Sequence, residues 1–233
     1  MNFPDPLVKA TLIKRYKRFL ADVRFEDGTE TTAHIANPGG MIGLKDPGMT
    51  IWLSPARNPA RKLKWSWEIA EADGGMVGVS TAHPNAIAEE AILAGRIPEL
   101  AGYENLRREV KYGKNSRIDI LLEDPNRPIA YVEIKNVHLM RTPGLAEFPD
   151  AVTARGAKHL AELGDMVEQG HRAVMLYVVQ RTDCDSFALA EDVDPAYAAA
   201  FRQAMTRGVE MLCYMCDITT QKITLDRPLP LTT

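Results

Sequence analysis

Apolar and polar side chains alternate along residues 116–136 in the manner of two β-strands joined by a turn. The runs 117–122 and 129–135 carry the alternation, and the segment between them, Glu-Asp-Pro-Asn-Arg-Pro, is rich in turn-forming residues. We therefore predict a β-hairpin centred on Asn126, in which residues equidistant from Asn126 face one another.

In that hairpin Asp119 lies opposite Glu133, and Arg117 lies opposite Lys135. Because strand side chains alternate between faces, these four polar residues share one face, and the other face carries Ile118, Ile120, Val132 and Ile134. Directly opposed residues place their Cβ atoms about 4.5–5.5 Å apart, so two carboxylates there repel unless a cation lies between them. Oxygen ligands suit hard divalent cations, and the pair predicts a site for Mg²⁺ or Mn²⁺.

Lys135 follows two residues after Glu133 and points the same way, so it could orient a water or stabilise negative charge on a phosphate. An Asp, followed on the neighbouring strand by Glu-x-Lys, resembles the motif of the PD-(D/E)XK nucleases of the restriction-endonuclease-like fold. Ile118 stands where that motif often has proline. The alternative is an exposed hairpin face that carries surface ion pairs.

A helix is predicted over 84–94, ended by Gly95. Its positions 87, 90, 91 and 94 fall on one stripe, which places Glu90 on an otherwise apolar face. A polar group on a packing face normally has a partner. We therefore predict Glu90 as a third, assisting carboxylate of the metal site.

The N-terminal residues, to about position 80, show five short strand patterns, of which 12–25 reads as one long strand. This pattern predicts a small closed barrel of the OB type. Residues 84–220 show a helix, three strands, a helix, a strand, a helix and a strand, which is a mixed α/β order. We predict an OB-like, nucleic-acid-binding domain over 1–82 and a nuclease-like α/β domain over 83–233, with the polar stretch 136–147 as a loop at the rim of a cleft.

Two segments of the predicted barrel, 14–19 and 57–67, interleave basic and aromatic residues. Single-stranded nucleic acid is bound in this way, with cations at phosphates and rings against bases. Solvated lysines beside core tryptophans are the alternative, and we expect Trp65 and Trp67 to pack in the core. The residues expected to contact nucleic acid are Lys14, Arg15, Lys17, Arg18, Arg57, Arg61, Lys62, Lys64, Arg117, Arg155 and Lys158.

A formal net charge of −3 excludes a globally basic nucleic-acid binder, so binding must use local patches. We find no apolar run of membrane-spanning length and no signal-peptide pattern, and we expect a cytoplasmic protein without a membrane partner. The three cysteines argue against a disulfide framework. Cys213 and Cys216 lie three apart on a predicted strand, so they face opposite ways and are expected to be buried fillers.

Several long stretches resemble the sugar fermentation stimulation protein (SfsA) family. They are residues 12–23, 61–63, 97–103, 109–113, 116–119, 131–137 and 148–156. The resemblance implies an N-terminal OB-like domain, a C-terminal nuclease-like domain and DNA binding, and it links the chain by name to regulation of sugar (maltose) metabolism. The chain departs from the family at 37–41, where Asn-Pro-Gly-Gly-Met replaces the expected Asn-Thr-Gly-Ser-Met.

These observations support two main hypotheses. In the first, the protein is a metal-dependent nuclease in which Asp119 and Glu133 hold the metal, Glu90 assists and Lys135 positions the attacking water. In the second, it is a non-catalytic, DNA-binding transcriptional regulator that keeps the nuclease scaffold. DNA is the expected partner, and single-stranded DNA is one form that it could bind. Action on RNA is a third hypothesis. The sequence does not determine the oligomeric state, and a homodimer is one alternative.

Overall fold

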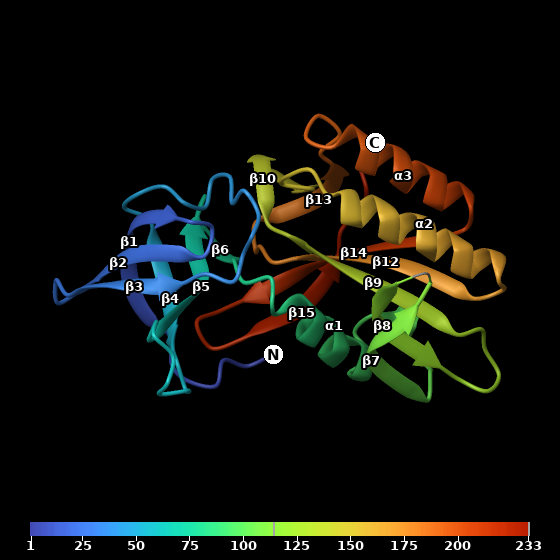
Figure 1. Cartoon of the computed structure of the whole chain (residues 1–233), viewed down its shortest axis with the longest axis horizontal. Coiled ribbons are helices and arrows are strands. Elements are labelled where there is room, and N and C mark those ends of the chain that lie inside the picture. The colour runs from blue at the N-terminus through green and yellow to red at the C-terminus, as the bar shows by residue number, and fades with distance from the viewer. Residues whose placement is uncertain (114, 233) are drawn as a thin grey trace.

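The N-terminal strands form a closed barrel in the computed structural model, which describes residues 1–113 and 115–232 (Figure 1). The barrel is closed where His34 of the third strand pairs with Ser66 of the fifth, and apolar side chains such as Leu12, Ile51 and Trp67 fill it. This confirms the predicted OB-like barrel. Its strands, which pair in the order β3-β2-β1-β4-β5-β6, are β1 (Val8–Tyr16), β2 (Leu20–Phe25), β3 (Glu30–His34), β4 (Thr50–Pro55), β5 (Trp65–Ala72) and β6 (Gly75–Gly78).

The segment predicted as one long strand over 12–25 is instead the hairpin β1–β2. The chain reverses at Lys17 and Arg18, whose φ angles are 48° and 62°. Left-handed turn residues are usually Gly, Asn or Asp, and none stands here, so the sequence concealed the turn. The first basic cluster therefore lies at a hairpin tip.

The C-terminal half is built on a six-stranded mixed sheet, in the order β15-β14-β12-β9-β8-β7. The central strand β12 runs parallel to both β9 and β14, and the remaining pairs are antiparallel. These strands are β7 (Asn105–Tyr112), β8 (Ser116–Glu123), β9 (Ala130–Val137), β12 (Arg172–Val179), β14 (Glu210–Ile218) and β15 (Ile223–Pro228).

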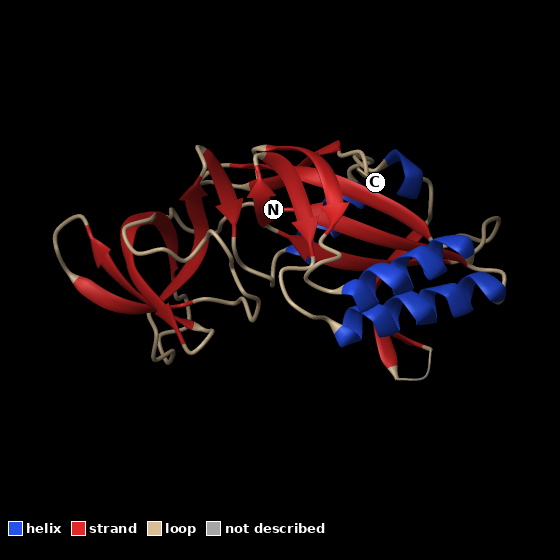
Figure 2. Ribbon diagram, turned by 90° about the horizontal axis from the view of Figure 1, so that it is seen from above, coloured by secondary structure: helices blue, strands red, loops and turns tan. Residues whose placement is uncertain are grey.

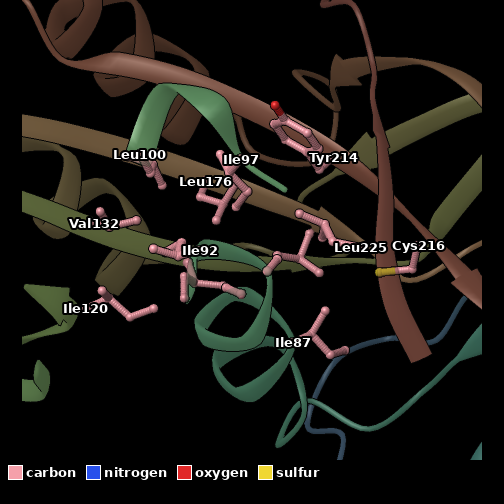
Figure 3. Packing of buried hydrophobic residues seen from close by; sticks show 14 of the residues in the cluster. Ile87, Ile92, Ile97, Leu100, Ile120, Val132, Leu176, Tyr214, Cys216 and Leu225 are labelled. Carbon is pink, nitrogen blue, oxygen red and sulfur yellow. The ribbon is translucent and has the colours of Figure 1, made fainter. Parts of the chain in front are cut away.

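Helices cover both faces of this sheet. One face carries α1 (Pro84–Leu93) and the short 3-10 turn η1 (Pro98–Leu100), and the other carries the helix pair α2 (Ala154–Glu168) and α3 (Pro195–Thr206), which lie side by side in Figure 2. Figure 3 shows Ile92 of α1 beside the sheet residues Ile120 and Val132, whereas Ile87 of the same helix lies on the side of Leu225. The mixed α/β class predicted for this half is confirmed.

Residues 136–147, predicted as a polar loop, instead contain strand β10 (Leu139–Thr142) and most of β11 (Gly144–Phe148), and these strands form a small sheet with β13 (Cys184–Leu189). The prediction was wrong because charged residues were taken as a sign of a loop. In the structure Arg141 of β10 and Glu147 of β11 instead pair across the two strands, with Nη2 and Oε1 2.6 Å apart. Neither β13 nor β15 was predicted.

The barrel is attached to the sheet domain by direct polar contacts. Gly78 N–H donates to the carbonyl of Gln180 (2.9 Å), and the guanidinium of Arg181 meets the carboxylate of Asp73 (3.1 Å). The glycine loop 37–41 approaches so closely that a Cβ on Gly39 would lie 2.5 Å from Oδ2 of Asp150. A side chain at position 39 would therefore force the Asp150 carboxylate to move.

The two neighbouring cysteines behave as predicted. Cys213 lies in the cluster beneath α2 and α3, whereas Cys216 lies in the cluster beneath α1, so they occupy opposite faces of the sheet. Burial raises the pKa of both thiols. Among the described residues, no helix combines the length and apolarity needed to cross a membrane.

Candidate active site

The β8–β9 hairpin has the predicted register, with Ile120 opposite Val132 and Leu122 opposite Ala130. The backbone pairing ends there. Beyond it, Oδ2 of Asp119 accepts a hydrogen bond from the N–H of Ile134 at 2.7 Å, so a side chain replaces the ladder of backbone bonds.

The end of the backbone pairing corrects the prediction that Ile118 and Ile120 share one face of the hairpin. Ile118 packs in the cluster beneath α2 and α3, and Ile120 packs in the cluster beneath α1, so the two do not share a face. The strand therefore twists at Asp119, the residue between them, where it separates from β9.

Asp119 and Glu133 line the same open pocket, of about 450 Å³. Lys135 lines it as well, together with residues from the start of α1 and from α2. The structure thus brings together the three residues that the Asp, Glu-x-Lys motif singled out.

The Asp119 carboxylate is held on both oxygens. Nδ2 of Asn85, in the first turn of α1, donates to Oδ1 at 2.8 Å, and Ile134 N–H donates to Oδ2. Burial raises the pKa of Asp119 and the charge of Glu133 raises it further, against the opposing effect of the two hydrogen bonds. A second positive charge in the pocket would relieve that repulsion.

Glu133 is only 2% exposed. Its Oε1 contacts Lys135 Nζ at 2.6 Å and also Nδ1 of His159 on α2. Burial disfavours the ionised form, but the hydrogen bond from His159 and the charge of Lys135 outweigh burial and lower the pKa of Glu133. The carboxylate is therefore ionised in the interior of the protein.

The second oxygen of Glu133 is the exception. Its Oε2 is buried and meets no hydrogen-bond donor among the described residues, a costly state for an acceptor. Two carboxylates, one with an unpartnered oxygen, fit a hard divalent cation, because Mg²⁺ is commonly held by one or two carboxylates and keeps several waters. Asp119 and Glu133 are the residues that would hold it, and the described chain places no larger cluster of acidic, His or Cys ligands together.

Glu90 does not belong to this set, which corrects its predicted role. The buried stripe of α1 consists of Ile87, Ala88, Ala91 and Ile92, and this leaves Glu90 on the exposed edge of the helix. Its side chain is 46% exposed and its Oε2 lies 2.6 Å from the amino group of Met1. Glu90 does not line the pocket.

Two supporting residues were not predicted as part of the site. His159 lies one helical turn after Arg155 on α2 and both line the pocket, but the contact of His159 with Glu133 joins distant parts of the chain. For Asn85, the sequence carries no signal beyond its position at the start of a helix.

The predicted basic residues of the sheet domain separate into two groups. Arg155 lines the pocket, with its Nε 3.3 Å from Nε2 of His159. Lys158 lies outside it, where its Nζ is 3.3 Å from Ser116 Oγ. Arg117 is also outside and donates to the carbonyl of Glu109 at 3.2 Å.

Three of the predicted basic residues of the barrel are engaged within the fold. Arg15 donates to the carbonyls of Asn37 (2.8 Å) and Gly39 (3.1 Å) and so holds the glycine loop. Arg57 pairs with Asp5 at 2.7 Å, and Lys64 donates to the carbonyl of Pro59 at 2.8 Å. Their expected contact with nucleic acid competes with these bonds.

The remaining predicted barrel cations lie in two places. Lys14, Lys17 and Arg18 are exposed on the β1–β2 hairpin, although Lys14 lies 3.4 Å from Asp22. Arg61 and Lys62 line a second pocket, between the barrel and α1.

Comparisons with known proteins agree with this architecture. The family model described as "SfsA N-terminal OB domain" matches residues 13–79, and the model "Sugar fermentation stimulation protein RE domain" matches residues 82–222. Sugar fermentation stimulation protein homologs from Paramagnetospirillum magneticum and Rhodospirillum centenum are each 62% identical, over 98% and 99% of this chain and 97% and 99% of theirs. The structure of Pyrococcus furiosus SfsA in complex with Ca²⁺ superimposes with a TM-score of 0.89 at 25% identity, covering 100% of this chain and 98% of that one.

Proposed function

The chain belongs to the sugar fermentation stimulation protein family, and we propose that it is a divalent-metal-dependent nuclease that binds DNA and hydrolyses its phosphodiester bonds. The observation that carries the proposal is the convergence of Asp119 and Glu133 in one pocket, with Oε2 of Glu133 buried and unpartnered within the described structure. In this proposal residues 83–233 perform the chemistry, and residues 1–82 bind the nucleic acid.

Asp119 and Glu133 would hold Mg²⁺ or Mn²⁺. Such a cation, when bound, would supply Lewis-acid chemistry: it lowers the pKa of a water and neutralises charge that develops on the phosphate. The Pyrococcus furiosus relative was determined with Ca²⁺. That cation also prefers oxygen ligands, which supports a hard-cation site in this family.

The residues of the chain have distinct roles in this proposal. Lys135, whose Nζ is 2.6 Å from Oε1 of Glu133, orients the attacking water and stabilises negative charge at the phosphate. The exposed guanidinium of Arg155 binds a phosphate oxygen. Asn85 and His159 fix the two carboxylates, so little reorganisation is needed when the substrate arrives.

A second candidate is a DNA-binding regulator that does not cleave. Lys135 and His159 already compensate one oxygen of Glu133, so the acidic pair can persist in the fold without a metal. The other oxygen of Glu133 argues against this candidate, because it is buried and has no hydrogen-bond donor among the described residues. Either activity on DNA would occur in the cytoplasm and would connect the protein to sugar fermentation through gene expression or DNA processing.

Isothermal titration with Mg²⁺ and Mn²⁺ tests the metal site. The variant Asp119→Asn keeps an acceptor for Ile134 N–H while it removes the charge. Glu123→Gln is the matched control, because this carboxylate lies at the far end of the same hairpin and pairs with Arg107 at 2.7 Å. We expect binding by the wild type and the control, and no binding by Asp119→Asn.

The same proteins are then incubated with end-labelled single-stranded and duplex DNA, with and without Mg²⁺. Cleavage that requires both Mg²⁺ and Asp119 supports the nuclease. A wild type that binds DNA but no divalent metal would overturn the proposal and favour the regulator.

A further inference from the structure

A second pocket, of about 600 Å³, lies beside the first, at the junction of the barrel with α1. It is lined by the end of β3, the loop before β5 and the connection from β6 to α1, which runs between the two halves of the molecule (Figure 1). Ala82 in that connection lines this pocket and the carboxylate pocket alike. The two hollows are therefore neighbours on one surface.

The charged groups of this second pocket favour an anionic ligand. Arg61 and Lys62 both line it, and Nη1 of Arg61 is 3.2 Å from Oγ of Ser66. The acidic residue Glu68 also lines it, but its two oxygens are taken up inside the fold. Oε1 accepts from Ser54 Oγ at 2.6 Å, and Oε2 lies 2.7 Å from Nε2 of His83.

The pocket also offers an aromatic surface. His34 lines it, and the ring of His34 lies nearly parallel to that of Phe19, with an interplanar angle of 12° and centroids 6.4 Å apart. Phe19 lies outside the pocket lining and is 43% exposed although it is large and apolar, and His34 itself is half-buried. Exposed rings beside cations are the means by which proteins hold unpaired bases and their phosphates.

We propose that this hollow is a strand pocket, formed by His34, Arg61, Lys62, Ser66 and Ala82, that binds unpaired nucleotides of single-stranded DNA next to the scissile phosphate. The strand leaves the carboxylate pocket at Ala82 and continues onto the barrel, where Arg61 and Lys62 contact its phosphates and His34 stacks with a base. The position of the scissile phosphate in this proposal rests on the proposed nuclease function; the binding of the strand does not. Unpaired DNA is favoured because a base that is paired and stacked inside a duplex cannot also stack on His34.

Binding of a fluorescent single-stranded oligonucleotide to the full chain, measured by anisotropy in EDTA over a range of salt, tests the strand pocket. For Arg61→Ala we expect weaker binding and a log–log salt slope that is smaller by about 0.7. For His34→Ala we expect a loss of about fivefold or more, because base stacking contributes about 1–3 kcal/mol. Arg24→Ala is the matched control from the barrel, because Arg24 pairs with Glu30 at 2.8 Å outside this pocket, and its affinity should be unchanged.

Thermal melting of each variant verifies that it is folded, and Arg61→Lys should restore most of the affinity if Arg61 acts through its charge. The proposal is overturned if folded Arg61→Ala and His34→Ala bind the oligonucleotide as the wild type does. Equal affinity of the wild type for a duplex of the same length would overturn it as well.

The experiments can contradict the strand-pocket proposal and the nuclease proposal independently of each other. Cleavage that depends on Asp119 but is indifferent to Arg61 and His34 would leave the nuclease standing and remove the strand pocket. Single-strand binding that depends on Arg61 and His34, in a protein that never cleaves, would leave the strand pocket standing and remove the nuclease.

Discussion

Asn85 donates a hydrogen bond from Nδ2 to Oδ1 of Asp119 at 2.8 Å, and this bond ties the start of α1 to β8 at the point where β8 leaves its partner strand. Helix α1 follows directly on the connection from the barrel. The position of an acidic residue in the sheet domain thus depends on a segment that also borders the strand pocket.

Asn85→Ala should weaken binding of Mg²⁺ or Mn²⁺ about tenfold, because residues that orient metal ligands typically contribute at least this much to metal affinity. Asp119 would then be held by Ile134 N–H alone. Titration calorimetry measures the change. Asn126→Ala, at the exposed turn of the hairpin, is the control and should bind the metal normally; equal affinities for the two variants would contradict the role of Asn85.

Glu133→Gln should abolish metal binding and cost about 3 kcal/mol of the free energy of unfolding, because it removes one partner from a buried charge cluster. Lys135 and His159 would be left without the carboxylate that they contact. Urea denaturation gives the free energy. A variant that is as stable as the wild type would show that these contacts do not form in solution.

Glu90→Gln should leave metal affinity within twofold of the wild type. The exposed pair of Glu90 with the Met1 amino group is also worth little, about 0–1 kcal/mol, because solvent screens it. Calorimetry and urea denaturation measure the two quantities. Loss of metal binding would instead restore Glu90 to the site as a carboxylate that acts through water.

Asp150→Asn should remove part of the acid sensitivity of the fold. Burial opposes ionisation of Asp150, but its contact with His138 and the N–H groups of Met41 and Gly40 lower the pKa of this carboxyl overall. Because the folded pKa lies below the usual value of about 3.9, its stabilising contribution is complete above about pH 4 and disappears as the pH falls through the folded pKa. The stability difference between wild type and variant should therefore shrink below pH 4 in urea denaturation; a difference independent of pH would contradict this account.

Two neighbouring basic residues should give opposite results. Lys17→Ala, at the exposed hairpin tip, should reduce the log–log salt slope of DNA binding by about 0.7–0.9 and leave the melting temperature unchanged. Arg15→Ala should lower the melting temperature, because Arg15 holds the carbonyls of the glycine loop. Anisotropy and thermal melting separate the two effects, and a lower melting temperature for Lys17→Ala would show that this residue also supports the fold.

The sequence by itself determined the β8–β9 hairpin, its register at Ile120 and Val132, and the convergence of Asp119 with Glu133 and Lys135. These features depend on the two-residue period of a strand and on one turn, both of which are local. The OB-like barrel was predictable for the same reason, since most of its short strands are joined by recognisable turns; the β1–β2 turn at Lys17 and Arg18 is the exception.

Only the tertiary structure decided which polar residues meet across the chain. Asn85 with Asp119 and His159 with Glu133 are separated by 34 and 26 residues, and no local pattern encodes such contacts. Glu90 lies on the exposed edge of α1 and so does not belong to the site. The prediction was wrong because the small and apolar residues of this helix allow more than one choice of buried stripe. Tertiary structure also decided which basic residues are available to nucleic acid. A basic residue that bonds to a carbonyl or a carboxylate of the fold stabilises the fold instead, and that bonding partner is known only once the chain is packed.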